Sequence, residues 1–266
     1  MSTPDDVLIS PILDRFRLTG RAALVTGAGQ GIGRGFAHAL ASAGAAVTIV
    51  DLDKSKADVV AAEIASLGGR AHAVEANVTN EADIRRFVDE TVQEFGRLDI
   101  AVNNAGINRN AAAEATTLEE WDLHQSVNLR AVFRSCQLEA EAMFPNGYGK
   151  IINTASMASL IVPHPQKQVA YNVAKAGVVA LTKTLAAEWA DRGIRVNCMS
   201  PGIIRTALIE GSEALRPLVK EWLAGIPAGR LGEVSDLQGG LVYLSSSVSD
   251  YMTGHNLIIE GGQTLW

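Results

Sequence analysis

The 266-residue sequence is poor in the residues that build disulfide frameworks and metal sites. Its two cysteines, Cys136 and Cys198, lie far apart and form no CxxC pair. Its five histidines are scattered without the spacing of metal ligands. These absences argue against a disulfide framework and a zinc site, so we expect no metal.

Positive charge and long apolar runs are also scarce. Lysine and arginine number 23 against 29 acidic residues, and no basic stripe stands out that would bind nucleic acid. The sequence contains no run of about 18 apolar residues, so we expect no membrane-spanning segment. Met1–Pro11 lacks the basic start and apolar core of a signal peptide. We expect a cytoplasmic protein without a nucleic-acid or membrane partner.

The chain does contain a regular alternation of short apolar runs with helical patterns, and no linker or repeat divides it. Hydrophobic residues make up 47% of the sequence, enough for a sizeable core. Strands that alternate with helices favour parallel pairing, with helices covering both faces of the sheet. We predict one α/β domain with a Rossmann-type doubly wound parallel sheet. Its strands are expected at Ala22–Val25, Ala45–Val50, His72–Val74, Leu98–Val102, Lys150–Thr154, Ile194–Cys198 and Leu257–Ile259.

A glycine-rich loop, Thr26–Gly33, follows the first of these strands and precedes a helical pattern. Glycines let a backbone turn tightly and approach a pyrophosphate, which the N-terminus of the next helix then attracts. The strict G-x-G-x-x-G fingerprint is not met, because Ile32 and Arg34 stand where its register needs glycine. Asp51 ends the second strand, where a carboxylate can accept hydrogen bonds from the ribose hydroxyls of NAD and repel the 2′-phosphate of NADP.

Tyr171 and Lys175 are four residues apart on a predicted helix and therefore share one face. A lysine cation near a phenol favours the phenolate and is expected to lower the phenol's pKa. Ser156 follows the fifth strand, where its hydroxyl could hold a substrate oxygen. This pattern predicts removal of an alcohol proton by Tyr171.

These motifs together resemble the short-chain dehydrogenase/reductase family, from Phe16 to Trp266. The resemblance rests on the glycine loop, Asn103–Gly106, Ser156, Tyr171-x3-Lys175 and Pro201-Gly202. It implies a flexible extension at residues 1–15 and an NAD-binding catalytic domain at residues 16–266. It implies catalytic roles for Asn128, Ser156, Tyr171 and Lys175. It also implies cofactor contacts from Gly27, Gln30, Gly31, Ile32, Gly33, Asp51, Leu52, Asn77, Val78, Asn104, Ala105, Gly106, Tyr171, Lys175, Pro201, Gly202, Ile204 and Thr206.

Substrate and assembly follow from the same resemblance. Ser156 stands 15 residues before Tyr171, a spacing similar to that of polyol and sugar dehydrogenases, and Ser159 is the less favoured alternative. The C-terminal Gly261–Trp266 run resembles the tail of galactitol-type members. We expect NAD-dependent oxidation of a hydroxylated secondary alcohol by a homotetramer. Candidate substrate contacts are Ser156, Ala158, His164 and Tyr171.

Two alternatives remain open. Apolar residues within Ile203–Trp222 could line a pocket for an acyl chain, which favours a 3-oxoacyl thioester reductase instead. From a different class, the chain could be a nucleotide-binding protein that has lost activity. The presence of all four candidate catalytic residues gives that second alternative no support.

Overall fold

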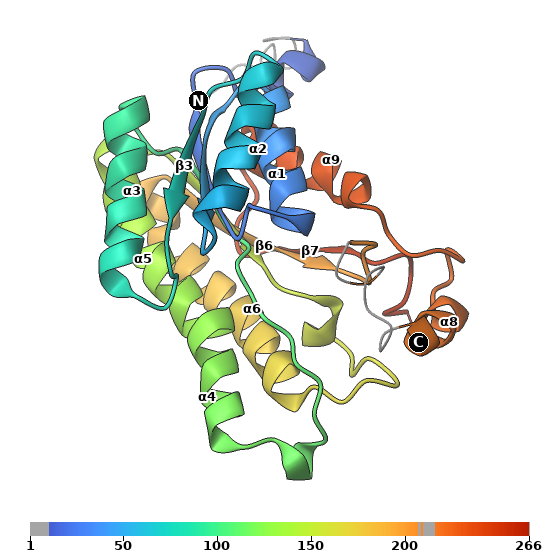
Figure 1. Cartoon of the computed structure of the whole chain (residues 1–266). Helices are drawn as coiled ribbons and strands as arrows, with labels where there is room; N and C mark the ends of the chain where they lie inside the picture. Colours follow the sequence, from blue (N-terminus) through green and yellow to red (C-terminus); the bar gives the residue numbers. More distant parts are fainter. Residues whose placement is uncertain (1–10, 207–208, 210–215, 266) are drawn as a thin grey trace.

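Seven parallel strands form a single sheet in the order β3-β2-β1-β4-β5-β6-β7 (Figure 1). The computed structural model describes residues 11–206, 209 and 216–265. All seven predicted strands are present, which confirms the predicted fold class. The strands are β1 (Ala22–Thr26), β2 (Ala46–Asp51), β3 (Ala71–Glu75), β4 (Ile100–Asn103), β5 (Gly149–Thr154), β6 (Ile194–Pro201) and β7 (Asn256–Ile259).

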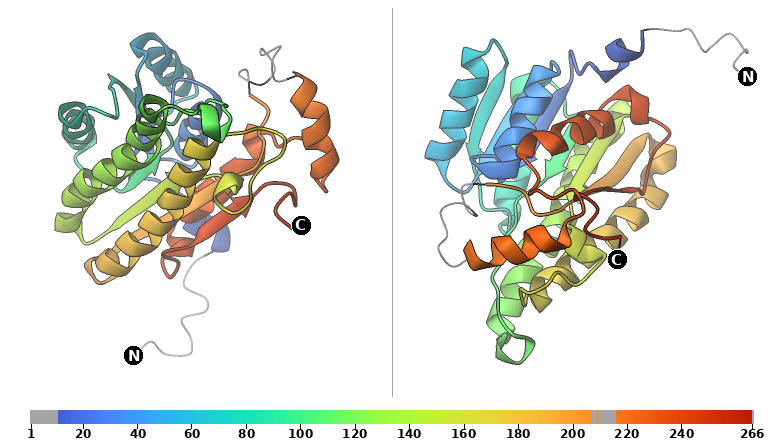
Figure 2. Two further views of the ribbon diagram at one scale, coloured as in Figure 1. Left: turned by 90° about the horizontal axis from the view of Figure 1, so that it is seen from below. Right: turned by 90° about the vertical axis from the view of Figure 1, so that its right-hand side faces the viewer.

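Helices cover both faces of the sheet (Figures 1 and 2). One face packs against α1 (Gly31–Ser42), α2 (Lys54–Ser66) and α9 (Val234–Ser245). The opposite face packs against α3 (Glu81–Phe95), α5 (Ala131–Met143) and α6 (Val169–Trp189).

Alternation along each strand divides the core into these two layers. In β1, Ala23 and Val25 belong to the layer with α1 and α9, whereas Leu24 belongs to the layer with α3 and α5. All three side chains are fully buried. Burial on both faces explains why the strands read as continuous apolar runs rather than as alternating patterns.

Capping residues set the ends of several helices. Asn80 precedes α3, and its side-chain oxygen accepts hydrogen bonds from the backbone N–H groups of Ala82 and Asp83. Gly96 ends the same helix in the left-handed conformation, with φ +80°, that glycine tolerates.

The helical segment that includes Trp121–Met143 is interrupted. It consists of α4 (Leu118–Gln125), one π-helical turn (Ser126–Arg130) and α5. A π-turn adds a residue to the helical turn and is frequent at functional sites. Here it contains Asn128, a candidate catalytic residue.

The amino-terminal ends of the central strands carry a cluster of charged residues, which we call the amino-edge cluster: Arg21, Arg97, Asp99, Lys150 and Asp250. The Asp99 side chain is fully buried and accepts hydrogen bonds from Arg21 (2.8 Å), Arg97 (2.6 Å) and the backbone N–H of Ala22 (3.0 Å). Lys150 is also buried and pairs with Asp250 at 2.8 Å. These contacts join β1, β4 and β5 at one edge of the sheet.

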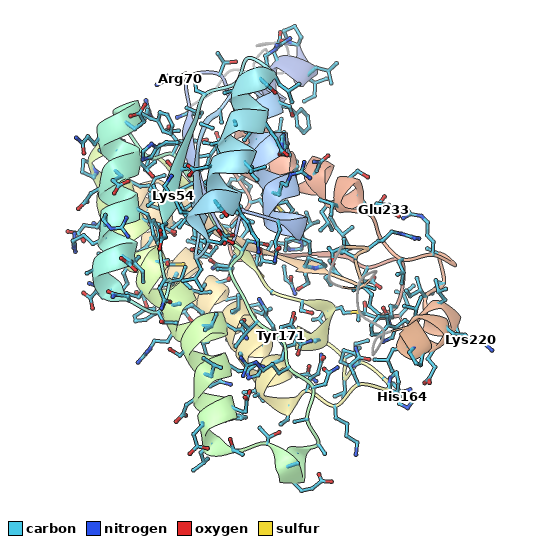
Figure 3. All side chains as sticks on the ribbon, viewed as in Figure 1. Lys54, Arg70, His164, Tyr171, Lys220 and Glu233 are labelled. Carbon is cyan, nitrogen blue, oxygen red and sulfur yellow. The ribbon has the colours of Figure 1, made fainter. Side chains whose placement is uncertain are left out.

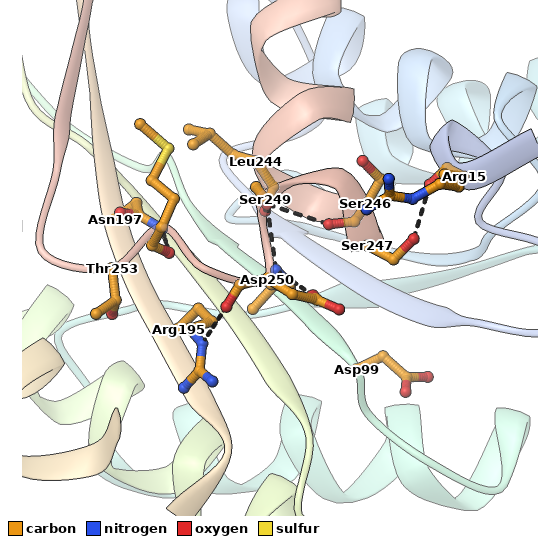
Figure 4. Close-up of polar contacts among 12 residues, drawn as sticks. Arg15, Asp99, Arg195, Asn197, Leu244, Ser246, Ser247, Ser249, Asp250 and Thr253 are labelled. Atoms are coloured by element: carbon orange, nitrogen blue, oxygen red, sulfur yellow. Dashed lines mark hydrogen bonds and ion pairs between the residues drawn. The ribbon is translucent and has the colours of Figure 1, made fainter. Parts of the chain in front are cut away.

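The adjoining turn after α9 is held to the same edge (Figure 4). Arg195 in β6 donates from Nε to the carbonyl oxygen of Asp250 at 2.6 Å. The Ser249 hydroxyl donates to the carbonyl oxygen of Leu244 at 3.0 Å and receives a hydrogen bond from Lys150 Nζ at 3.1 Å. Polar contacts therefore hold the turn after α9 against the amino-terminal ends of β5 and β6.

The segment Ile203–Trp222, whose apolar residues could line a pocket, contains part of α8 (Arg216–Gly225). Trp222 of α8 is buried in a small apolar cluster with Met157, Ile203 and Ile226, to which Ile209 and Leu218 add partly buried side chains. Leu208 and Leu215, two other apolar residues of this segment, lie outside the described residues.

The beginning of the chain lies mostly outside the described residues as well. Within the predicted extension, Ile12–Phe16 forms a 3₁₀ turn, and the carbonyl oxygen of Arg15 accepts a hydrogen bond from Ser247. In the described part of the chain, every helix is too short or too polar to cross a bilayer.

Candidate active site

The glycine loop has a conformation that only small residues permit. Gly27 and Gly31 have φ angles of +62° and +56°. A Cβ atom added to Gly33 would lie 2.1 Å from the carbonyl oxygen of Gly27, which is far inside van der Waals contact. The loop and the first turn of α1 are therefore in direct contact, and a larger residue at 33 would push them apart.

The N-terminus of α1 presents free donors beside this loop. Gln30 is the N-cap residue, and its side chain makes no cap hydrogen bond. The first N–H groups of a helix have no partner within the helix, and together with the helix dipole they attract an anion such as a pyrophosphate. Gln30 is exposed, whereas Ile32 is half-buried against the core.

Asp51 lies at the end of β2, against the glycine loop. Its Oδ2 atom accepts a hydrogen bond from the backbone N–H of Gly29 at 2.8 Å, and Oδ1 accepts one from the N–H of Asp53 at 3.1 Å. A carboxylate has about four acceptor positions, so two remain for the hydroxyls of a ribose. The neighbouring Leu52 is largely exposed.

Asn104 ties the end of β4 to the glycine loop. Its amide nitrogen Nδ2 donates to the carbonyl oxygens of Thr26 (3.1 Å) and Gly27 (3.2 Å). The Thr26 hydroxyl oxygen in turn accepts from the backbone N–H groups of Asn104 and Ala105. A Cβ at Gly27 would lie 2.9 Å from Ala105 Cα, so these two segments pass each other closely.

The remaining predicted cofactor residues are placed around this centre. A Cβ at Gly31 would lie 3.7 Å from Thr206, so the segment after β6 reaches the loop. Pro201 and Ile204 are buried, and Gly202 packs tightly against Glu260.

Asn77 and Val78 follow β3. Asn77 is exposed, and its side-chain oxygen accepts hydrogen bonds from the backbone N–H (2.9 Å) and hydroxyl (2.8 Å) of Thr79. Val78 is half-buried. Both residues lie at the carboxyl edge of the sheet.

Asn128 is fully buried in the π-turn. Its side chain forms two hydrogen bonds with Ile107, accepting from the N–H and donating to the carbonyl oxygen, both at 2.9 Å. A Cβ at Gly106 would lie 2.8 Å from Asn128 Oδ1 and 3.7 Å from Lys175 Nζ. Asn128, Gly106 and Lys175 therefore meet at one place.

Lys175 and Tyr171 occupy the first turns of α6 and share one face, as predicted. Lys175 is buried and donates from Nζ to the carbonyl oxygen of Thr154 at 2.6 Å. Its Nζ lies 5.7 Å from the centre of the Tyr171 ring. Tyr171 lies centrally in the molecule, below the sheet edge that carries the glycine loop (Figure 3).

The expected lowering of the Tyr171 pKa was wrong for the chain without a bound cofactor. Burial is the largest influence and raises the pKa of the phenol, against a smaller lowering by the Ser156 hydroxyl. Burial also lowers the pKa of Lys175 to about 8, which weakens the lysine as a source of positive charge. The sequence reveals that Tyr171 and Lys175 are neighbours, but not how deeply they are buried.

Ser156 follows β5 and caps the short turn Met157–Ser159. Its Oγ accepts a hydrogen bond from the N–H of Ala158 at 3.2 Å, and both residues are buried. The Ser159 hydroxyl instead donates to the carbonyl oxygen of Ser156 at 2.6 Å. Ser159 is therefore engaged in holding the turn, which supports Ser156 as the residue that faces Tyr171.

His164 does not join the other candidate substrate residues. It is exposed on the loop near α8, and Figure 3 shows it well apart from Tyr171. On the same loop, Gln166 accepts a hydrogen bond from the indole N–H of Trp222 at 2.8 Å. This contact, which the sequence alone does not reveal, attaches α8 to the loop after Ser156.

The chain is similar to known proteins along nearly its whole length. A family model described as Enoyl-(Acyl carrier protein) reductase matches residues 27–264. D-threitol dehydrogenase of Mycolicibacterium smegmatis is 38% identical, with 94% of this chain and 95% of that protein covered. Galactitol 2-dehydrogenase of Rhizobium johnstonii is 38% identical, covering 95% and 98%. A 3-oxoacyl-[acyl-carrier-protein] reductase of Thermotoga maritima is also 38% identical, covering 92% and 98%.

Two solved structures are also similar to this chain in fold and sequence. A short-chain type dehydrogenase/reductase from Mycobacterium marinum has a TM-score of 0.92 and 43% identity, with 96% of this chain and 99% of that chain covered. A gluconate 5-dehydrogenase from Burkholderia cenocepacia, in complex with NADP and tartrate, has a TM-score of 0.88 and 38% identity, covering 96% and 99%. The family model that matches residues 27–264 and relatives of 38% identity over nearly the whole chain show that the chain belongs to the short-chain dehydrogenase/reductase family.

Proposed function

We propose that the protein oxidises a hydroxylated secondary alcohol, such as a polyol or sugar, to a ketone with NAD, and catalyses the reverse reduction. The observation that carries this proposal is the meeting of Asn128, Ser156, Tyr171 and Lys175 beside a glycine loop bordered by Asp51. Ligands bind at this carboxyl edge in doubly wound folds.

The side chains supply proton transfer and orientation. Tyr171 accepts the alcohol proton while the carbon–hydrogen bond breaks, and a bound nicotinamide would accept that hydrogen with its electron pair. Ser156 holds the substrate oxygen as its charge changes. Because burial keeps the Tyr171 proton in place without cofactor, the phenol is ready to donate it in the reducing direction, whereas the positive charge of oxidised NAD would favour its loss.

Asp51 is expected to make the enzyme prefer NAD to NADP. Asp51→Asn should reduce the ratio of kcat/KM values for NAD over NADP by about 10- to 100-fold, because hydrogen bonds to charged groups contribute about 1.5–3 kcal/mol. Steady-state kinetics with both cofactors measure this ratio.

Asp53→Asn is the matched control. Asp53 caps α2 by accepting from Ser55 and Lys56, and asparagine caps helices equally well. Its cofactor ratio should match that of the wild type. A wild-type enzyme that uses NADP as well as NAD would contradict our assignment of Asp51.

The substrate class is supported by the relatives named for threitol and galactitol. The experiment compares a polyol or sugar, a matched simple secondary alcohol and a 3-hydroxyacyl thioester by NADH formation. A site that binds hydroxyls should reject the simple alcohol strongly, because its polar groups are then left without partners.

The second candidate, a 3-oxoacyl thioester reductase, is favoured by the apolar cluster that joins Met157 beside Ser156 to Ile203 and Trp222. A relative of that name has similar identity. If the thioester gives the higher kcat/KM by about tenfold or more, a difference of about 1.4 kcal/mol, this candidate replaces the polyol assignment.

We also propose a homotetramer in a reducing, cytoplasmic setting. Leu123, Phe133 and Val173 expose apolar side chains on α4, α5 and α6, and Leu265 in the tail is largely exposed. Pairing of these helices between subunits would cover such surface. Both cysteines are free, as expected in a reducing compartment. Light scattering at micromolar concentration should give the tetramer mass, and a monomer would refute the assembly.

A further inference from the structure

A carboxyl group is buried in the apolar face of α5, away from the reacting groups. Val132, Cys136 and Met143 form the inward stripe of this helix, and Glu139 lies within it, fully buried. An acidic side chain is seldom fully buried without a partner cation.

An amide lies beside Glu139 where a cation would be expected. Its Oε2 atom accepts a hydrogen bond from Nδ2 of Asn103 at 3.0 Å. The same Nδ2 lies 3.1 Å from Oδ1 of Asn153, which also accepts from the Cys136 thiol at 3.4 Å. Among the described residues, Glu139 Oε1 has no hydrogen-bond partner.

The charged groups of neighbouring elements do not compensate Glu139. On its own helix the nearest titratable group is Cys136, whose thiol pKa is raised by burial and by Glu139. Among the described residues, Glu139 is hydrogen-bonded by Asn103 of β4, and the groups that continue from Asn103, namely Asn153 of β5 and Thr182 of α6, are uncharged. The ion pairs between α3 and α5, Arg85–Glu141 and Arg134–Glu81, lie on the outer surface.

Burial without a cation disfavours a carboxylate. It raises the pKa of Glu139 to about 8, and the hydrogen bond from Asn103 lowers it by a smaller amount. At pH 7 the side chain is therefore mainly a neutral carboxylic acid.

The contacts of Glu139 lead toward the active site along two strands. Asn103 ends β4 and is followed at once by Asn104, Ala105 and Gly106, which border the glycine loop. Asn153 precedes Thr154, whose carbonyl oxygen holds Lys175. Asn153 also donates to the Thr182 hydroxyl at 3.1 Å, and Thr182 lies on the helix that carries Tyr171.

We propose that Glu139, as a neutral acid, is a positioning residue that fixes the ends of β4 and β5 through Asn103 and Asn153, and so holds the cofactor wall and the support of Lys175 in place. This goes beyond the chemistry proposed above and rests on it only in assuming that a nicotinamide cofactor binds at the glycine loop. Ionisation of Glu139 would break the arrangement, because no cation in the described part of the chain contacts its carboxyl group to balance the charge.

The first test is the pH dependence of stability, measured by urea unfolding of wild type and Glu139→Gln from pH 5 to pH 9. The unfolded carboxyl loses its proton near its ordinary pKa, while the folded one keeps it up to about pH 8. The wild type should therefore lose stability as the pH rises between these two pKa values. Relative to Glu139→Gln, its folding equilibrium constant should fall by up to about tenfold per pH unit. Parallel curves would show that Glu139 is not held neutral and would overturn the proposal.

The second test is the dissociation constant of NADH, measured by fluorescence titration on variants that are shown to be folded. At pH 7, Glu139→Gln should bind as the wild type does, whereas Glu139→Leu, which cannot accept from Asn103, should bind at least several-fold more weakly. Equal NADH binding by both variants would show that Glu139 does not position the cofactor wall, and would overturn the proposal. Glu141→Gln, on the exposed side of the same helix, is the matched control and should change nothing.

If Glu139→Leu does not fold, the pH series still decides the matter. The NADH dissociation constant of the wild type should rise above pH 8 relative to that of Glu139→Gln, and coincident curves would refute positioning. A wild-type protein that binds no NADH at any pH would instead refute the proposed function, which separates the two failures.

Discussion

Replacement of Tyr171 by phenylalanine is expected to lower kcat by about 10²- to 10⁴-fold, the usual contribution of a general acid or base. The Tyr171 side chain is half-buried with Ser156 beside its hydroxyl, and Lys175 Nζ lies 5.7 Å from its ring. Phenylalanine fills almost the same volume and cannot accept or donate the proton. The dissociation constant for NADH and the unfolding midpoint should remain near those of the wild type.

Tyr251→Phe provides the matched control. Tyr251 is fully exposed next to Asp250 of the amino-edge cluster, at the end of the sheet opposite to the site. The same chemical change there should leave kcat unaltered. Near-normal turnover by Tyr171→Phe would mean that another group transfers the proton.

Replacement of Asp99 by alanine is expected to lower the free energy of unfolding by about 3 kcal/mol, the lower end of the effect of breaking a buried charge pair. Asp99 is fully buried, and its loss deprives Arg21, Arg97 and the N–H of Ala22 of their acceptor. The lower value applies because both arginines are partly exposed and can be hydrated. Urea unfolding measures the change.

The kinetic constants of folded Asp99→Ala should match those of the wild type, because the amino-edge cluster and the catalytic residues lie at opposite ends of the sheet. Asp89→Ala, on the exposed face of α3, should change stability by no more than about 0.5 kcal/mol. A similar small effect for Asp99→Ala would show that this ion cluster contributes no net stability.

Strands and motifs could be predicted because their signals are local. The seven apolar runs correspond to β1–β7 within a few residues, since double-sided burial requires continuous apolar sequence. The glycine loop was recognisable because its conformation excludes larger residues, as the contact between Gly33 and Gly27 shows.

Features that depend on depth or on distant partners could not be predicted. Asn128 in the π-turn bonds to the backbone of Ile107, 21 residues away, and the Tyr171 pKa is set by burial that no spacing reveals. His164 was chosen for its chemistry, but it lies on the exposed side of its loop.

Glu139 did leave a signal. It stands seven residues after Val132 and three after Cys136, so helical periodicity places it on the inward stripe. An acidic residue on such a stripe indicates a buried polar contact. Its partners, Asn103 and Asn153, come from two other strands and could be identified only from the structure.

The strand order also bears on how the chain is assembled during synthesis. No two neighbouring strands are joined by a hairpin, yet each new strand is added to an existing edge: β2 and β3 extend outward from β1, then β4 returns to the other side of β1, and β5, β6 and β7 follow. A chain that emerges from the ribosome N-terminus first can therefore build its sheet without inserting a strand between two already paired. Until β4 (Ile100–Asn103) is made, one edge of β1 has no partner strand, and after that β4, β5 and β6 in turn leave their outer edge open until the next strand is added, so the edge that can pair wrongly moves outward as synthesis proceeds.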